Sequence, residues 1–85
     1  MTDTRPVLTL YSREHCHLCG VMVAELKPVL ARFPVRFQIL DVDADPRARE
    51  LYGSQIPVLL LDGVILSRFR LDAARVESAL GQWLA

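Results

Sequence analysis

Apolar side chains recur along the chain with two different spacings, and each spacing predicts one kind of secondary structure. Residues 7–11 form a short apolar run of strand-forming side chains, which indicates a buried strand. Residues 35–39 alternate between apolar and polar side chains, as a half-exposed strand does, and this segment continues to residue 42. We therefore expect two strands separated by the longer segment between them.

A second pair of strands follows in the last third of the chain. Residues 56–61 are apolar throughout and predict a fully buried strand. Asp62-Gly63 is a two-residue sequence favoured in hairpin turns. Residues 64–66 are apolar again, so they are predicted to return as the antiparallel partner.

Helical spacing appears directly after the first strand. The apolar residues there recur every three or four positions and would form a stripe facing the core; they are Leu18, Met22, Leu26, Val29, Leu30 and Phe33. Pro28 lies inside this pattern. Because proline has no N–H and clashes with the preceding turn, we expect it to kink the helix or end its regular part near Lys27.

Two further helices are predicted from their end signals. Asp45 can cap a helix that starts with Pro46, and Gly53 is placed to end this short helix of residues 46–52. A last helix is expected from about Asp72. Its inward-facing residues are predicted to be Val76, Leu80, Trp83 and Leu84.

The element order is therefore strand, helix, strand, helix, strand, strand, helix (βαβαββα). Two consecutive strands joined through a helix are expected to be parallel with a right-handed crossover, whereas a hairpin is antiparallel. The chain is predicted to fold as an α/β domain, a mixed four-stranded sheet flanked by three helices. With 85 residues and no repeat or linker, residues 1–85 form one domain.

Composition narrows the classes of partner. Ten basic residues balance ten acidic ones, so there is no basic excess that would favour nucleic acid or an anionic membrane. The first six residues lack the apolar core of a signal peptide, and no apolar run reaches the length of a membrane span. We expect a monomer in the cytoplasm with neither nucleic acid nor membrane as partner.

The chain has two cysteines, Cys16 and Cys19, and both lie at the start of the first predicted helix. Positions three apart fall on one helix face, so the two sulfurs can meet. Cys16 would lie where the helix has unpaired N–H groups and the positive end of its dipole, which favours the reactive thiolate. In a reducing cytosol such a pair is redox-active or metal-binding rather than a structural staple.

This arrangement resembles the glutaredoxin branch of the thioredoxin-like fold. The resemblance is carried by residues 11–19, with the basic Arg13 before the dithiol, by Ile56-Pro57, and by the hairpin followed by a C-terminal helix. It implies a glutaredoxin-like thiol-disulfide oxidoreductase. It also implies that the bond between Ile56 and Pro57 is cis and lies opposite the cysteines.

The predicted chemistry assigns a role to each residue near the dithiol. Cys16 would attack a substrate disulfide as thiolate, and Cys19 would resolve the mixed disulfide. Arg13, His15 and His17 could favour the thiolate, or both histidines could be solvated residues without a role. Beside the cis bond, the free backbone of Ile56 could pair with a peptide or glutathione, and Arg13 could bind a substrate carboxylate.

Two departures from glutaredoxins bear on the substrate. His17 and Leu18 stand where proline and tyrosine are usual, and residues 67–70 (Ser-Arg-Phe-Arg) replace a Gly-Gly pair followed by acidic residues that hold glutathione. We expect no permanently bound cofactor and weak turnover with glutathione as co-substrate. The expected substrates are protein or small-molecule disulfides, and the reductant, glutathione or a thiol protein, stays open.

Two other classes of function compete with this reading. The two cysteines and two histidines are crowded into five residues, which could hardly surround one zinc ion, so we expect no metal site within a chain. An iron–sulfur cluster shared between two chains stays open, since the resemblance implies that some glutaredoxins hold one with glutathione. A redox-inert interaction module would leave the paired cysteines without a purpose.

Overall fold

The computed structural model describes residues 4–84 and contains the predicted order of strands and helices. Its elements are β1 Val7–Ser12, α1 His17–Arg32, β2 Arg36–Asp41, the short 3-10 helix η1 Val42–Ala44, α2 Pro46–Tyr52, β3 Val58–Leu61, β4 Val64–Arg68 and α3 Ala73–Trp83. Within the described residues, no helix is long and apolar enough to cross a membrane.

The four strands form one mixed sheet in the order β2-β1-β3-β4, which confirms the predicted architecture. β1 pairs in parallel with β2 and antiparallel with β3, and β3 and β4 form the predicted hairpin. Asp62 and Gly63 have φ angles of 46° and 87°, the left-handed values that a tight hairpin turn of this kind requires. β1 and β3 are therefore central, and β2 and β4 are the edge strands.

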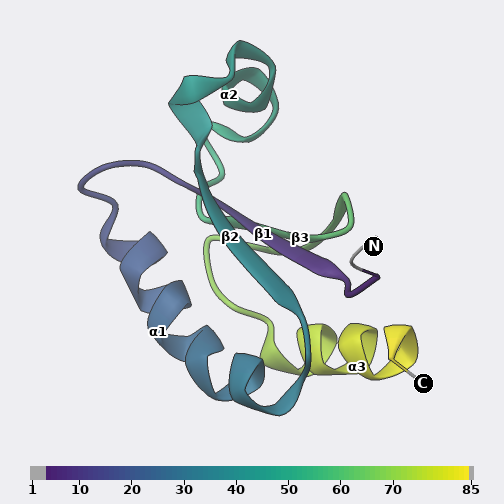
Figure 1. Ribbon diagram of the computed structural model, residues 1–85. Coiled ribbons are helices and arrows are strands. Elements are labelled where there is room, and N and C mark those ends of the chain that lie inside the picture. The colour runs from purple at the N-terminus through teal and green to yellow at the C-terminus, as the bar shows by residue number, and fades with distance from the viewer. Residues whose placement is uncertain (1–3, 85) are drawn as a thin grey trace.

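The main hydrophobic core lies on the face of the sheet that α1 and α3 cover (Figure 1). Its buried members come from both helices and from three strands; they are Leu8, Leu10, Met22, Leu26, Val29, Leu59, Leu66, Val76 and Leu80. The predicted stripe of α1 is thus confirmed at Met22, Leu26 and Val29. Burial of these side chains fixes the start of α1 relative to the sheet.

α2 contacts the other face of the sheet at the end of β1 through a pair of tyrosine rings. Side chains alternate along a strand, so Tyr11 faces away from the core residue Leu10. Its ring stacks on that of Tyr52 from α2, with 5.1 Å between the ring centroids. Val58, which pairs with Tyr11 across the sheet, is fully buried on the same side. α2 therefore lies at the end of the sheet from which the cysteine-bearing loop departs (Figure 1).

Two predictions about the helices are wrong in part. α1 does not end near Lys27 but continues through Pro28 to Arg32. Because proline has no N–H, the carbonyl of Ala24, four residues earlier, lacks its usual helical hydrogen bond. Pro28 and Ala24 are both exposed, so water can solvate that carbonyl. In α3, Val76 and Leu80 are buried as predicted, but Trp83 is 51% exposed and Leu84 is 38% exposed. The last turn of α3 extends past the core.

We predict that Pro28→Ala raises the free energy of unfolding by about 2 kcal/mol, because it restores one helical hydrogen bond and removes a steric clash. Urea unfolding followed by circular dichroism measures the change. Pro34→Ala is the matched control, since Pro34 lies outside the helix and its replacement should lower stability by at most about 1 kcal/mol. Equal effects at both positions would contradict this account of α1.

Candidate functional site

Cys16 and Cys19 form a disulfide at the first turn of α1. Cys16 is the N-cap of the helix, and its Sγ accepts a hydrogen bond from the backbone N–H of Cys19 at 3.2 Å. Cys16 is partly exposed, whereas Cys19 is only 3% exposed. The dithiol therefore has one sulfur that solvent can reach and one that is covered.

The loop between β1 and α1 turns sharply enough to present Cys16 at the surface. The backbone N–H of Cys16 donates to the carbonyl of Arg13 at 3.2 Å, which closes the turn. His15 has a φ of 64°, a left-handed conformation that histidine adopts more readily than most residues. The turn aims the start of α1, with its unpaired N–H groups, at the Cys16 sulfur.

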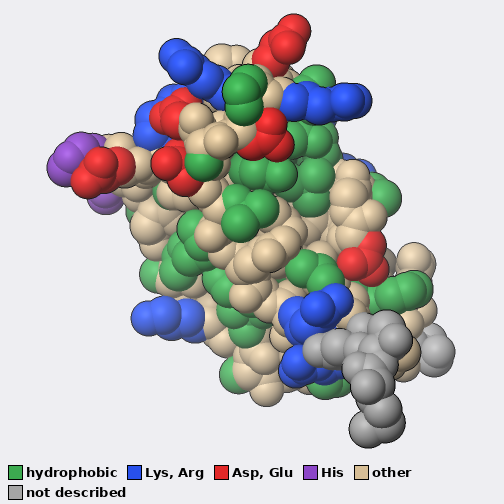
Figure 2. Space-filling model, turned by 45° about the horizontal axis from the view of Figure 1, so that its top comes forward, with side chains coloured by type: hydrophobic (Ala, Val, Ile, Leu, Met, Phe, Trp, Pro, Cys, Tyr) green, Lys and Arg blue, Asp and Glu red, His purple; other side chains and the backbone are tan. Residues whose placement is uncertain are grey.

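The start of α1 favours an anion at Cys16. The first turn of α1 contains no acidic residue, and the positive end of the helix dipole points at the N-cap. His15 and His17 are both exposed, and the two histidine side chains gather at a projecting corner of the surface (Figure 2). Their predicted effect on the thiolate stays a prediction.

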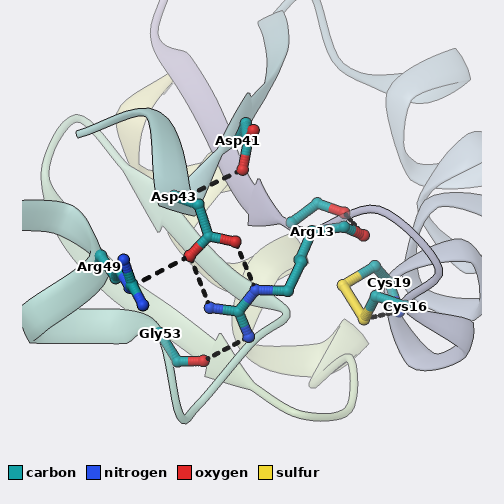
Figure 3. A network of polar contacts seen from close by, with 8 residues as sticks. Arg13, Cys16, Cys19, Asp41, Asp43, Arg49 and Gly53 are labelled. Carbon is teal, nitrogen blue, oxygen red and sulfur yellow. Dashed lines mark hydrogen bonds and ion pairs between the residues drawn. A yellow bond between two sulfur atoms is a disulfide. The ribbon is translucent and has the colours of Figure 1, made fainter. Parts of the chain in front are cut away.

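Arg13 points away from the disulfide and toward the opposite loops (Figure 3). Its Nε donates to Asp43 Oδ2 at 2.6 Å and its Nη2 donates to Asp43 Oδ1 at 2.8 Å. Its Nη1 donates to the carbonyl of Gly53 at 3.1 Å. These bonds raise the pKa of Arg13 and hold the pKa of Asp43 below its ordinary value. Arg13 thus links the cysteine-bearing loop to η1 and to the end of α2.

Gly53 ends α2 as predicted, but not through a left-handed conformation. Its φ and ψ are −56° and −30°, which are helical values. A Cβ here would lie 2.5 Å from the carbonyl oxygen of Arg49 and 3.4 Å from Arg13 Nη2. Glycine is therefore required by the close approach of the chain to Arg49 and Arg13 and not by its backbone angles.

The Ile56–Pro57 bond is cis, as the resemblance implies. β3 begins only at Val58, two residues later than predicted, and Val58 pairs with Tyr11. This register places Pro57 beside Ser12, at the end of the sheet where the cysteine-bearing loop starts. Within residues 4–84, no hydrogen bond engages the N–H or carbonyl of Ile56. These groups are available to a bound chain.

Phe69 lies next to this proline in an unusual conformation. Its φ is 65°, a left-handed value that is rare for a bulky residue, and its N–H donates to the carbonyl of Pro57 at 2.9 Å. Its side chain is 47% exposed. Sequence reasoning noted the absence of glycine in this region, but it did not find the contact with Pro57.

The structure also bears on metal binding. Within the described part of the chain, no three histidine, cysteine, aspartate or glutamate side chains converge on a point where they could hold a metal ion. The two cysteine sulfurs are bonded to each other instead. The residues present fit thiol redox chemistry.

Residues 7–81 match the glutaredoxin-like domain family, which also carries the label DUF836. The chain belongs to this family. An uncharacterized protein of Mycobacterium tuberculosis strain H37Rv, Rv0508, is 26% identical over 84 residues, which cover 93% of this chain and 87% of that protein.

Solved structures place this glutaredoxin-like chain in the thioredoxin fold. The solution structure of protein Ne2328 from Nitrosomonas europaea superimposes with a TM-score of 0.81 at 26% identity, covering 94% of this chain and 96% of that one. Protein XcR50 from X. campestris gives a TM-score of 0.62 at 31% identity, covering 88% and 96%. A thioredoxin from Halobacterium salinarum gives 0.67 at 18% identity, covering 94% and 75%, which is a likeness of fold.

The pairing of Arg13 with Asp43 predicts a pH dependence of stability. Because the pKa of Asp43 is lowered in the folded state, its contribution is present above the unfolded pKa of about 3.9 and is lost as the pH falls through the folded value. Asp43→Asn should therefore lower the urea midpoint at pH 7 more than at pH 3. Glu50→Gln, which removes an exposed carboxylate from α2, is the control and should not show that pattern. An equal loss at both pH values for Asp43→Asn would refute the ion pair's contribution.

Proposed function

We propose that this protein is a thiol-disulfide oxidoreductase that uses Cys16 as nucleophile and Cys19 as resolving thiol. The observation that supports this most is the position of Cys16 as N-cap of α1, bonded to a buried Cys19 one turn further along. The membership in the glutaredoxin-like domain family adds to it. The physiological substrate class is a disulfide in a protein or a small molecule.

The reaction transfers two electrons in two exchange steps. The Cys16 thiolate attacks one sulfur of the substrate disulfide, and the other substrate sulfur leaves as a thiolate and takes up a proton. The Cys19 thiol then loses its proton, attacks Cys16 Sγ, and releases the second substrate thiol. The substrate gains two electrons and two protons, and the protein is left with the Cys16–Cys19 disulfide. Two further thiols, from glutathione or a thiol protein, reduce it again.

The environment of each sulfur suits its step. The N–H of Cys19 already bonds Cys16 Sγ, and the same donor would stabilise a thiolate there. Cys19 is covered, so a thiol in solution can attack the disulfide only at Cys16. We propose that Arg13 positions the loop and does not bind substrate, because binding a carboxylate would require it to release Asp43 or Gly53.

We propose that the backbone of Ile56, before cis-Pro57, pairs with one strand of the bound disulfide substrate. Phe69 and the neighbouring Arg68 and Arg70 stand where glutaredoxins carry a glycine pair and acidic residues. Phe69 holds a left-handed conformation that glycine adopts without cost, its side chain is exposed, and its backbone N–H donates to the carbonyl of Pro57. A bulky, basic segment here disfavours glutathione and leaves protein disulfides as the better substrates.

We predict that Cys16 in the reduced protein reacts with iodoacetamide well below the pH at which an ordinary thiol titrates, about 8.5. Peptide mapping after alkylation at graded pH should find Cys16 modified first and Cys19 protected. Cys19→Ser is the control and should keep the reactivity of Cys16. Preferential labelling of Cys19, or a Cys16 that titrates as an ordinary thiol, would contradict the assignment of Cys16 as nucleophile.

We predict weak glutathione-dependent turnover in a coupled assay with a glutathione mixed disulfide. Phe69→Gly should raise this turnover about tenfold, because it removes an exposed ring from the segment whose backbone bonds Pro57 and because glycine holds the left-handed conformation without cost. Trp83→Ala, at an exposed aromatic residue on α3, is the matched control and should leave turnover unchanged. If the unaltered protein already turns over glutathione as fast as Phe69→Gly, the argument from the missing glycines is wrong.

A further inference from the structure

β2 presents an unused hydrogen-bonding edge. It is the outer strand next to β1, and within residues 4–84 no strand pairs with its other side. The N–H of Arg36 donates to the carbonyl of Pro6, on the β1 side. Because backbone groups alternate in direction along a strand, Phe37, Ile39 and Asp41 direct their N–H and carbonyl groups outward. An extended chain could bond to all three.

This edge leads to the redox-active sulfur. A hollow of about 560 Å³ beside the disulfide is lined by Cys16, Cys19 and Ile39, among others. A second hollow is lined by Ile39, Leu40 and Asp41, and the two share Ser12, Arg13 and Ile39. Ile39 is 52% exposed, so an apolar side chain stands between the strand edge and the cysteines.

The Asp41 end of the edge, next to the cysteine-bearing loop, carries an exposed carboxylate outside the Arg13–Asp43 pair. Glu14 lines the second hollow, is exposed, and makes no ion pair among the described residues. Asp41 accepts only the backbone N–H of Asp43 there. Asp43 pairs with both Arg13 and Arg49, and the charge of Asp41 also acts on Arg13, so within the described residues Glu14 supplies the unpaired negative charge here. Acidic side chains gather next to the histidine corner on this surface (Figure 2).

We propose that β2 is the docking strand for an extended segment of a disulfide-containing protein, which adds to the sheet edge and carries a basic side chain toward Glu14. The inference rests on the proposed oxidoreductase function and names its substrate class. Backbone bonds to Phe37, Ile39 and Asp41 select an extended polypeptide, and Ile39 contributes an apolar contact next to the disulfide. The redox step is the same exchange at Cys16, with the docked segment supplying the disulfide.

The test uses a peptide of about ten residues, rich in valine and threonine, with one lysine and one cysteine in a disulfide with 2-nitro-5-thiobenzoate. The reduced protein releases the coloured thiolate, and its rate is measured. Two further peptides carry backbone N-methyl groups at every second residue: one at the odd-numbered positions and the other at the even-numbered positions. Strand addition predicts that methylation of one set, whose N–H groups would bond to β2, slows the reaction about tenfold, whereas methylation of the other set leaves the rate unchanged. Equal rates for the two N-methylated peptides would overturn the proposal.

Matched variants locate the docking strand. Ile39→Thr keeps a β-branched residue on β2 but removes its apolar contact, and Val64→Thr makes the same kind of change on the opposite edge strand, β4. The readout is the rate with the peptide divided by the rate with a small aromatic disulfide, which needs no docking strand. This ratio should fall several-fold for Ile39→Thr and stay constant for Val64→Thr. A fall for Val64→Thr alone would also overturn the proposal.

A separate experiment tests whether a basic side chain of the peptide contributes to docking. Replacing the peptide's lysine by glutamate should slow the reaction several-fold at low ionic strength, and Glu14→Gln should reduce that difference. No response to charge would remove the basic side chain from the proposal.

A failed reaction with the small disulfide would refute the oxidoreductase function itself, whereas reaction with it but equal rates for all peptides would refute only the docking strand. A stable dimer paired through β2, seen by sedimentation, would also refute it.

Discussion

The hydrogen bond from the backbone N–H of Cys19 to the sulfur of Cys16 makes the proposed nucleophile part of the helix cap. Whatever fixes the start of α1 therefore fixes the sulfur. Met22 and Leu26, one and two turns beyond Cys19, are buried in the main core against the sheet. Packing of an apolar stripe thus sets the position of a polar reaction centre, and no separate scaffold is needed for the site.

A second constraint joins the loops at this end of the sheet. The fork of Arg13 spans Asp43 and the carbonyl of Gly53, so one side chain connects the cysteine-bearing loop with the segments before and after α2. The pair is partly exposed and its strength depends on salt and pH. Its main effect is to position the chain, because Gly53 leads directly into the segment that carries the cis proline.

The two sides of the cysteines differ in character. On the Pro57 side, the bulky Phe69 holds a conformation that costs energy, and its backbone N–H occupies the Pro57 carbonyl. On the β2 side, a strand edge with outward backbone groups runs into the hollow beside Cys16. A small tripeptide gains little from a long edge, whereas an extended polypeptide can bond along it. This asymmetry is the basis on which we propose protein disulfides as substrates.

The sequence by itself determined the element order, the four-stranded mixed sheet and the helix-start position of the cysteines, since these follow from local spacing, caps and turn residues. It misjudged Pro28 and Trp83, because only packing decides which helix face meets solvent. It predicted that Arg13 tunes the thiolate or binds a substrate carboxylate, and it gave no sign of the bonds from this side chain to Asp43, thirty residues away. The left-handed Phe69 and the open edge of β2 were also decided by tertiary structure, because contacts between distant segments and strand order leave no local pattern in the chain.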